Sequence, residues 1–225
     1  MNNYCLSLVL LLAGNITTIY AQSAFQNLDY ESATVPVLPP NQFSVLPISL
    51  GLPGWSAFLG TNQQNEVYLN GLSLGSSEVS ILGPNISPSL IIEGKFTALL
   101  SAGAQGDASI SQVGSIPLSA EALLFKAKPG NGVFTVSLAG QAVQTVPLTV
   151  TLSYTLFGAD ISTFSGQSTE LKFTAVSDFA SGQGINNLYL DSISFSTQPI
   201  PEPGPIAIFS LGAVSLAWSL RKKAK

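Results

Sequence analysis

The sequence contains no histidine and only one cysteine, Cys5, in 225 residues. Histidine is the usual general acid or base near neutral pH and the commonest metal ligand, so its absence excludes catalysis by a Ser-His or Cys-His pair. A lone cysteine cannot form a disulfide within the chain, and no cysteine-based zinc site is possible. The most frequent forms of hydrolytic and zinc chemistry are therefore excluded.

Charge is also scarce. Only 9% of the residues are charged and 46% are hydrophobic, a composition too apolar for a disordered protein, and the length allows one sizeable domain. The cations of the central region, residues 22–200, are four lysines: Lys95, Lys126, Lys128 and Lys172. They are too few for the basic stripe that a phosphate backbone requires, so we expect no nucleic-acid partner.

The N-terminus carries a short apolar run, CLSLVLLLA, at residues 5–13, followed by a polar break and a small residue, Ala21. This order is typical of a secretory signal peptide that is cut after Ala21, although no lysine or arginine precedes the run. The alternative is a buried first strand. The position of the run at the very terminus favours export, so we assign residues 1–21 to a signal peptide.

The C-terminus carries a second uncharged stretch, residues 204–220, with Trp218 near its end. As a helix it would rise about 25 Å, against about 30 Å for the hydrocarbon core of a bilayer. The basic residues that follow are Arg221, Lys222, Lys223 and Lys225. Because positive charge resists translocation, we expect a transmembrane helix with this tail in the cytoplasm and the main domain outside. The alternative is a terminal core helix with a solvated tail.

The triplet Pro201-Glu202-Pro203 immediately precedes this span. The order of triplet, span and basic tail over residues 199–225 resembles the PEP-CTERM sorting signal of Gram-negative bacteria, although many members of that family end in arginines rather than lysines. The resemblance implies processing by an exosortase-type membrane protease and delivery to the cell envelope, the cell surface or the extracellular matrix. Two prolines also keep the backbone extended and outside helices and sheets, which suits a protease cleft.

Between these ends, residues 22–198 are predicted to form many short β-strands separated by turns such as LPPN, GPNISP and KPGNG. This pattern predicts an all-β fold, an antiparallel β-sandwich. In VFTVSLAG, alternation puts Phe134, Val136 and Leu138 on the core face. In the last strand, alternation separates Leu188, Leu190, Ser192 and Ser194 from Tyr189, Asp191, Ile193 and Phe195. The proline-rich residues 33–55 should form an extended connection or an edge segment.

Three stretches together resemble a galactose-binding-like jelly roll, the fold of many carbohydrate-binding modules. They are FQNLDYES at residues 25–32 with a later PGW, GADISTFSGQSTELKFTA at residues 158–175, and NLYLDSISFS at residues 187–196. The proline-rich insertion before Trp55 departs from the family pattern. The resemblance implies a first strand at residues 25–32 and a closing strand with a central aspartate.

In that family a calcium ion often joins the first strand to the last. Carried over by position, Glu31 and Asp191 are the implied ligands of a structural calcium ion, which takes about 6–8 oxygens. Alternation puts Asp29 on the same face as Glu31 and Tyr30 on the opposite face. The alternative is that both carboxylates are solvated or hydrogen-bonded strand residues.

A sugar site would need aromatic platforms and planar polar side chains. Trp55 and Tyr189 are the candidate ligand residues, with Tyr68 and Tyr154 as further aromatics, but a sandwich also needs aromatic rings for its own core. The acidic residues are scattered and no nucleophile motif stands in a convincing context, so we expect no enzyme. The function expected is a structural or adhesive role at the cell surface, and the alternative is a carbohydrate-binding module for an extracellular polysaccharide.

Overall fold

The computed structural model describes residues 23–178, 182 and 184–200. The predicted signal peptide, the Pro201-Glu202-Pro203 triplet, the span at residues 204–220 and the basic tail lie outside the described residues. Within the described part of the chain, no helix is long and apolar enough to cross a membrane.

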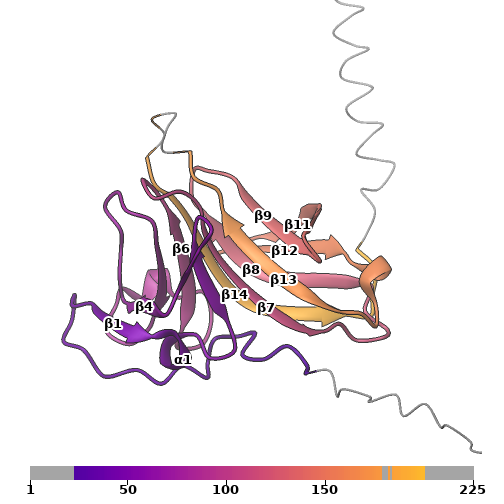
Figure 1. Ribbon diagram of the computed structural model, residues 1–225, viewed down its shortest axis with the longest axis horizontal. Helices are drawn as coiled ribbons and strands as arrows, with labels where there is room; N and C mark the ends of the chain where they lie inside the picture. The colour runs from indigo at the N-terminus through magenta and orange to yellow at the C-terminus, as the bar shows by residue number, and fades with distance from the viewer. Residues whose placement is uncertain (1–22, 179–181, 183, 201–225) are drawn as a thin grey trace, which may run out of the picture.

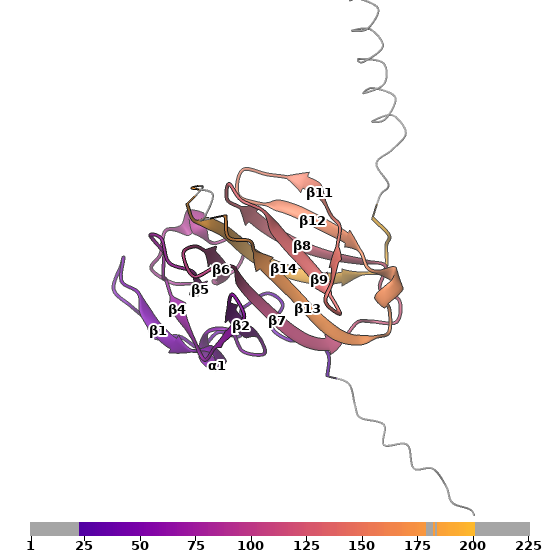
Figure 2. The ribbon, with the colours of Figure 1, turned by 45° about the horizontal axis from the view of Figure 1, so that its top comes forward.

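The described residues form a two-sheet β-sandwich, seen from two directions in Figures 1 and 2. The eight-stranded sheet contains, in spatial order, β1 (Ser44–Pro47), β4 (Glu66–Leu69), β5 (Glu78–Leu82), β6 (Thr97–Ala102), β14 (Asn186–Ser196), β8 (Ala122–Pro129), β12 (Thr155–Asp160) and β11 (Thr145–Val150). The six-stranded sheet contains β10 (Gln141–Val143), β9 (Phe134–Leu138), β13 (Ser168–Ala175), β7 (Ala108–Ser115), β2 (Ser56–Leu59) and β3 (Asn62–Gln64). The helical elements described are α1 (Ile48–Gly51), η1 (Pro88–Leu90) and η2 (Ser162–Phe164).

The prediction of a two-sheet sandwich is confirmed. Strand pairing is antiparallel throughout both sheets except between β4 and β5, which run parallel. A parallel pair needs a connection that returns the chain to the same end of the sheet. Here the residues between Leu69 and Glu78 make that return.

The core lies between the two sheets. Phe125 of β8 and Phe173 of β13 are fully buried, and their ring centroids lie 5.1 Å apart in an edge-on contact that joins the sheets. Val136 and Leu138 are fully buried and Phe134 packs against the same cluster, so the predicted core face of β9 is confirmed. Burying a side chain of this size stabilises the fold by about 1.5–3 kcal/mol.

The simple alternation predicted for β14 is wrong in its second half. Leu188 and Leu190 are in the core, but so is Ile193, which alternation had placed on the opposite face. The register shifts between Asp191 and Ser194, and Ser192 has a φ of 48°. A β-bulge inserts one extra residue and turns the following side chains to the other face, so the bulge explains why Leu190 and Ile193 share one side.

The proline-rich segment forms an edge, as predicted, because β1 is the outermost strand of the eight-stranded sheet. The prediction of a first strand at residues 25–32 is wrong. This segment contains turns, with positive φ angles of 50° at Asn27 and 60° at Tyr30. The Asn27 side chain holds the turn, since it accepts a hydrogen bond from the Ser32 amide at 3.0 Å and donates one to the Pro53 carbonyl at 3.1 Å.

The first and last described residues lie at the same end of the sandwich (Figure 1). The Ser115 amide, at the end of β7, donates to the Ser23 carbonyl at 2.9 Å. The Glu121 amide, just before β8, donates to the Ser196 carbonyl at 2.8 Å. Both ends of the described chain therefore flank the connection between β7 and β8.

Candidate functional site

A polar recess of about 420 Å³ lies on the outer face of the six-stranded sheet. We call it the polar recess and define it by the residues that line it: Gly60, Asp107, Ser109, Thr135, Ser137, Gly140, Ala142, Glu170, Lys172, Thr174 and Val176. The strands place these side chains by alternation. Because Val136 and Leu138 of β9 enter the core, Thr135 and Ser137 face outward.

Cross-strand register aligns the polar side chains of the recess in rows. Thr174 of β13 pairs with Thr135 of β9 on one side and with Ser109 of β7 on the other. Ser109 in turn pairs with Phe58 of β2. One row therefore runs from two threonines through a serine to an aromatic ring.

The next row contains the recess cation. Lys172 of β13 pairs with Ser137 of β9 and with Ser111 of β7. The Lys172 Nζ atom lies 5.1 Å from the centroid of the Phe58 ring, a cation–π contact. Hydroxyl groups, one ammonium group and one aromatic ring are therefore gathered on a single outward face.

Two carboxylates complete the recess. Glu170 lies on β13, two residues before the cation. Asp107 precedes β7, and its Oδ1 atom accepts a hydrogen bond from the Ser177 amide at 2.7 Å. This chemistry suits a hydroxyl-rich ligand, because hydroxyl side chains both donate and accept hydrogen bonds.

A second, smaller cavity of about 150 Å³ is lined by four acidic residues, Asp29, Glu31, Glu93 and Asp191, together with Gly94 and Ser192. We call it the acidic cavity. Glu31 and Asp191, which the sequence resemblance paired, both line it although they are far apart in the chain. Tyr30 is fully buried while Asp29 and Glu31 are exposed, so the predicted opposition of these side chains holds within a turn rather than a strand.

Glu31 and Asp191 each bind backbone groups of the segment between η1 and β6. The Glu31 Oε1 atom accepts hydrogen bonds from the amides of Lys95 and Phe96, at 2.7 and 3.0 Å. The Asp191 Oδ2 atom accepts the Thr97 hydroxyl at 2.8 Å and the Glu93 amide at 3.2 Å. The two carboxylates therefore tie the N-terminal turn and the last strand to the same loop.

The electrostatics of the acidic cavity are unusual because Asp191 is only 1% exposed. Burial raises the pKa of Asp191 to about 6, with a further rise from the Glu93 charge, although hydrogen bonds from Thr97, Ser192 and Glu93 oppose the shift. Hydrogen bonds from Lys126 and Ser192 hold the pKa of Glu93 below its usual value, and the Lys126 Nζ atom lies 2.5 Å from the Glu93 Oε2 atom.

The phenol of Tyr30 is the second unusual group. It is fully buried, and its hydroxyl has no hydrogen-bond partner among the described residues. Burial, and then the nearby charge of Asp191, raise the pKa of Tyr30 well above its usual value. The Tyr30 phenol therefore stays protonated at neutral pH beside Asp191.

The donor chemistry of the acidic cavity fits a hard cation, because calcium prefers carboxylate oxygens and the cavity gathers several of them. Glu31 and Asp191 are the residues that would hold such an ion. Among the described residues, however, no three acidic side chains converge as a ready-made metal-binding group. In this structure the carboxylate oxygens instead accept hydrogen bonds from the protein.

The two aromatic residues proposed as sugar ligands lie in different places. Trp55 is only 4% exposed, its ring packs 5.9 Å from Tyr30, and its Nε1 atom donates to the Asn27 carbonyl at 3.1 Å. A ring in that position offers no face to a ligand. Tyr189 lies on β14 of the other sheet, half-buried, with the Lys128 Nζ atom 5.8 Å from its ring centroid.

Sequence reasoning missed the residues of the polar recess. The signal was present in the polar faces of VFTVSLAG and TELKFTA, which alternate with the predicted core positions. It did not reveal that β9, β13 and β7 are neighbours, so it could not assemble the recess. For the acidic cavity, nothing in the sequence around Glu93 indicated that this residue would line it.

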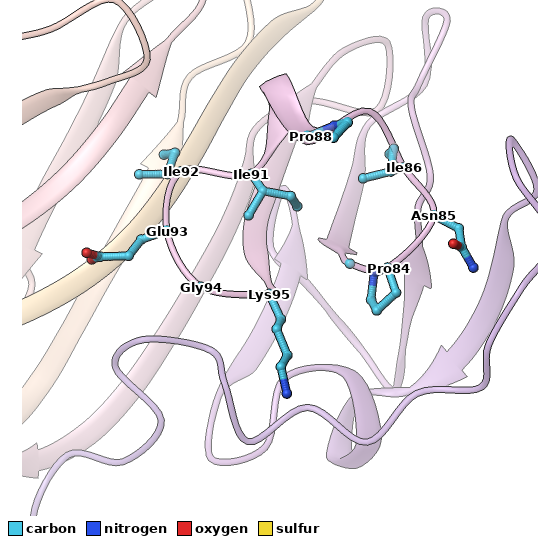
Figure 3. Close-up of a pocket in the computed structure, with 10 residues that line it drawn as sticks. Pro84, Asn85, Ile86, Pro88, Ile91, Ile92, Glu93, Gly94 and Lys95 are labelled. Carbon is cyan, nitrogen blue, oxygen red and sulfur yellow. The ribbon is translucent and has the colours of Figure 1, made fainter.

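A third hollow, of about 500 Å³, lies within one loop, residues 83–95. Figure 3 shows Ile86 and Ile91 pointing into it, while Glu93 and Lys95 point away. Its inward-facing side chains are apolar and come from a single connection, so it lacks the converging polar groups of a specific binding site.

The chain matches no protein-family model and no curated protein in sequence comparisons.

Proposed function

We propose that this chain is an exported surface protein whose β-sandwich has a structural or adhesive role in the cell envelope or extracellular matrix of a Gram-negative bacterium. The sequence features that support export and sorting by an exosortase-type protease are the predicted signal peptide at residues 1–21, the Pro201-Glu202-Pro203 triplet and the predicted transmembrane span at residues 204–220. Arg221, Lys222, Lys223 and Lys225 would hold the tail on the cytoplasmic side until it is processed.

The order of the terminal segments carries the proposal: an apolar run at the start of the chain, and the Pro-Glu-Pro triplet, an uncharged stretch and a basic tail at its end. The described chain ends at Ile200, beside the connection between β7 and β8, where the Glu121 amide binds the Ser196 carbonyl. The polar recess extends along β7, from Asp107 before the strand to the level of Val113, which pairs with Glu170. It therefore lies along the face of the six-stranded sheet rather than at the end of the sandwich where the described chain ends.

Mass spectrometry of the protein isolated from its native cells tests this role, because it reports both mature termini. We expect an N-terminus at Gln22 and a chain that ends near the Pro-Glu-Pro triplet, recovered from the envelope or the matrix. Deletion of residues 199–225 should release the domain into the medium or periplasm. A protein that retains Met1 and Lys225 and stays in the cytosol would refute the proposal.

The second candidate is a carbohydrate-binding module of the galactose-binding-like jelly-roll type. The polar recess favours it, because rows of hydroxyl groups beside an aromatic ring match the surface of a sugar. Thr135, Ser137, Thr174 and Lys172 would bind sugar hydroxyls, and Phe58 would cover an apolar ring face. Retention by a polysaccharide in affinity electrophoresis, lost in Thr135→Val/Thr174→Val, tests this candidate.

A further inference from the structure

We infer that the polar recess selects uncharged polysaccharide chains and rejects acidic ones, an inference that rests on the carbohydrate-binding candidate above. The argument begins with the charges in the recess. Glu170 and Asp107 contribute two carboxylates, and Lys172 contributes the one cation among the residues that line it. The carboxylate or sulfate groups of an acidic polysaccharide would therefore meet a net negative surface.

The single cation is also poorly placed to bind an anion. The Lys172 Nζ atom lies over the Phe58 ring at 5.1 Å. Tight binding of a carboxylate usually needs bidentate donors such as an arginine fork or several converging N–H groups. The residues that line the recess include no arginine.

The rest of the recess is suited to neutral hydroxyl groups. Thr135 and Thr174 pair across β9 and β13, and Ser137 lies beside the cation in the next row. These three hydroxyl side chains are at least partly exposed, whereas Ser109 of the same row is buried. A hydroxyl side chain donates one hydrogen bond and accepts others, as a sugar hydroxyl does. An uncharged ligand can therefore form hydrogen bonds with these hydroxyl groups and is not repelled by the carboxylates.

The domain as a whole reinforces this selection. Residues 22–200 contain eleven acidic residues and four lysines. Lys126 and Lys128 lie on β8 of the other sheet and Lys95 lies in the loop before β6, so these cations do not face the recess. A field of one sign slows the approach of a polymer of the same sign, more strongly at low salt.

Matched polymers provide the test. The full chain, purified in a nonionic polyoxyethylene detergent, is run through native gels that contain a panel of neutral polysaccharides and the carboxylated or sulfated derivative of each. Hydroxyethylcellulose with carboxymethylcellulose is one pair, and methyl-esterified with de-esterified pectin is another. We expect at least one neutral polymer to retard the protein and its acidic counterpart to retard it at least about threefold less, the size expected for one or two exposed charges.

Two variants test whether the recess causes the discrimination between neutral and acidic polymers. Glu170→Gln removes a recess carboxylate and should reduce the discrimination between paired polymers about threefold. Glu66→Gln makes the same charge change at an exposed position of β4, on the other sheet, and should leave the discrimination unchanged.

The outcomes separate the two ideas. Equal or stronger retardation by the acidic polymers overturns the inference and leaves the carbohydrate-binding candidate standing. Equal effects of Glu170→Gln and Glu66→Gln overturn the assignment to the recess. No retardation by any polymer of the panel overturns both the inference and the candidate function.

Discussion

The buried carboxylate of Asp191 should make the stability of this protein depend on pH in an unusual direction. Its pKa of about 6 in the folded chain compares with an ordinary value of 3.8, which applies once the chain unfolds. Between those values the folded chain holds a proton that the unfolded chain has lost. Stability contributed by this group is therefore complete below about pH 4 and is lost as the pH rises through 6.

The magnitude follows from the pKa difference. At about 1.36 kcal/mol per pKa unit, the shift corresponds to roughly 3 kcal/mol in the free energy of unfolding. That is a substantial fraction of the 5–15 kcal/mol, roughly, that stabilises an ordinary domain. Glu93 shifts in the opposite direction, because its pKa is lowered by Lys126 and Ser192, so the whole-protein curve alone does not isolate the Asp191 effect.

The Asp191→Asn variant isolates the contribution of Asp191 to the pH dependence of stability. Urea unfolding followed by tryptophan fluorescence, in chelator and at several pH values from 4 to 8, gives the free energy of unfolding of both proteins. The variant cannot ionise at this position, so its stability relative to the native chain should rise by about 3 kcal/mol between pH 4 and pH 7. A stability difference that stays constant with pH would refute the reasoning, whatever its absolute size.

The remaining predictions concern the cation, the loop turn and the aromatic rings. Calcium at about a hundred times its dissociation constant should stabilise the native chain at pH 7 by about 2.7 kcal/mol and leave the stability of Asp191→Asn unchanged. If a chelator leaves the melting temperature of the native chain unchanged, the calcium site is excluded. Gly94→Ala should cost about 2 kcal/mol, because Gly94 has a φ of 62° and an added methyl group would strike the Glu31 carboxylate. Gly140→Ala, with a φ of 74° and no atom within 4 Å of the added group, is the control and should cost about 1 kcal/mol in the same denaturation assay. Phe58→Ala should abolish polysaccharide retention. Trp55→Phe should cost about 1 kcal/mol of stability and leave retention intact. Loss of retention in Trp55→Phe but not in Phe58→Ala would place the ligand elsewhere.

Much of the sandwich could be predicted because strand periodicity is a local property. The alternation in β9 identified Val136 and Leu138 as core residues, and both are fully buried. The proline content of residues 33–55 predicted an edge, since proline cannot donate to a central ladder, and β1 is an edge strand. These predictions needed no knowledge of which strands are neighbours.

The predictions that failed depended on local backbone exceptions or on long-range packing. Residues 25–32 form turns rather than a strand because the Asn27 side chain binds the Ser32 amide and the Pro53 carbonyl. The bulge at Ser192 moved Ile193 into the core. Trp55 was a candidate platform by composition, but its packing against Tyr30 makes it a core residue.

The sequence by itself determined the chemistry available: no histidine, no disulfide, few cations, and strands whose faces alternate because the backbone pleat repeats every two residues. Only the tertiary structure decided which polar faces meet. Thr135, Thr174 and Ser109 share one recess because β9, β13 and β7 are neighbours, and Asp191 is buried beside Glu93 because the last strand lies between β6 and β8. The order of strands in a sheet is set by pairing between distant segments, and no local pattern in the chain records it.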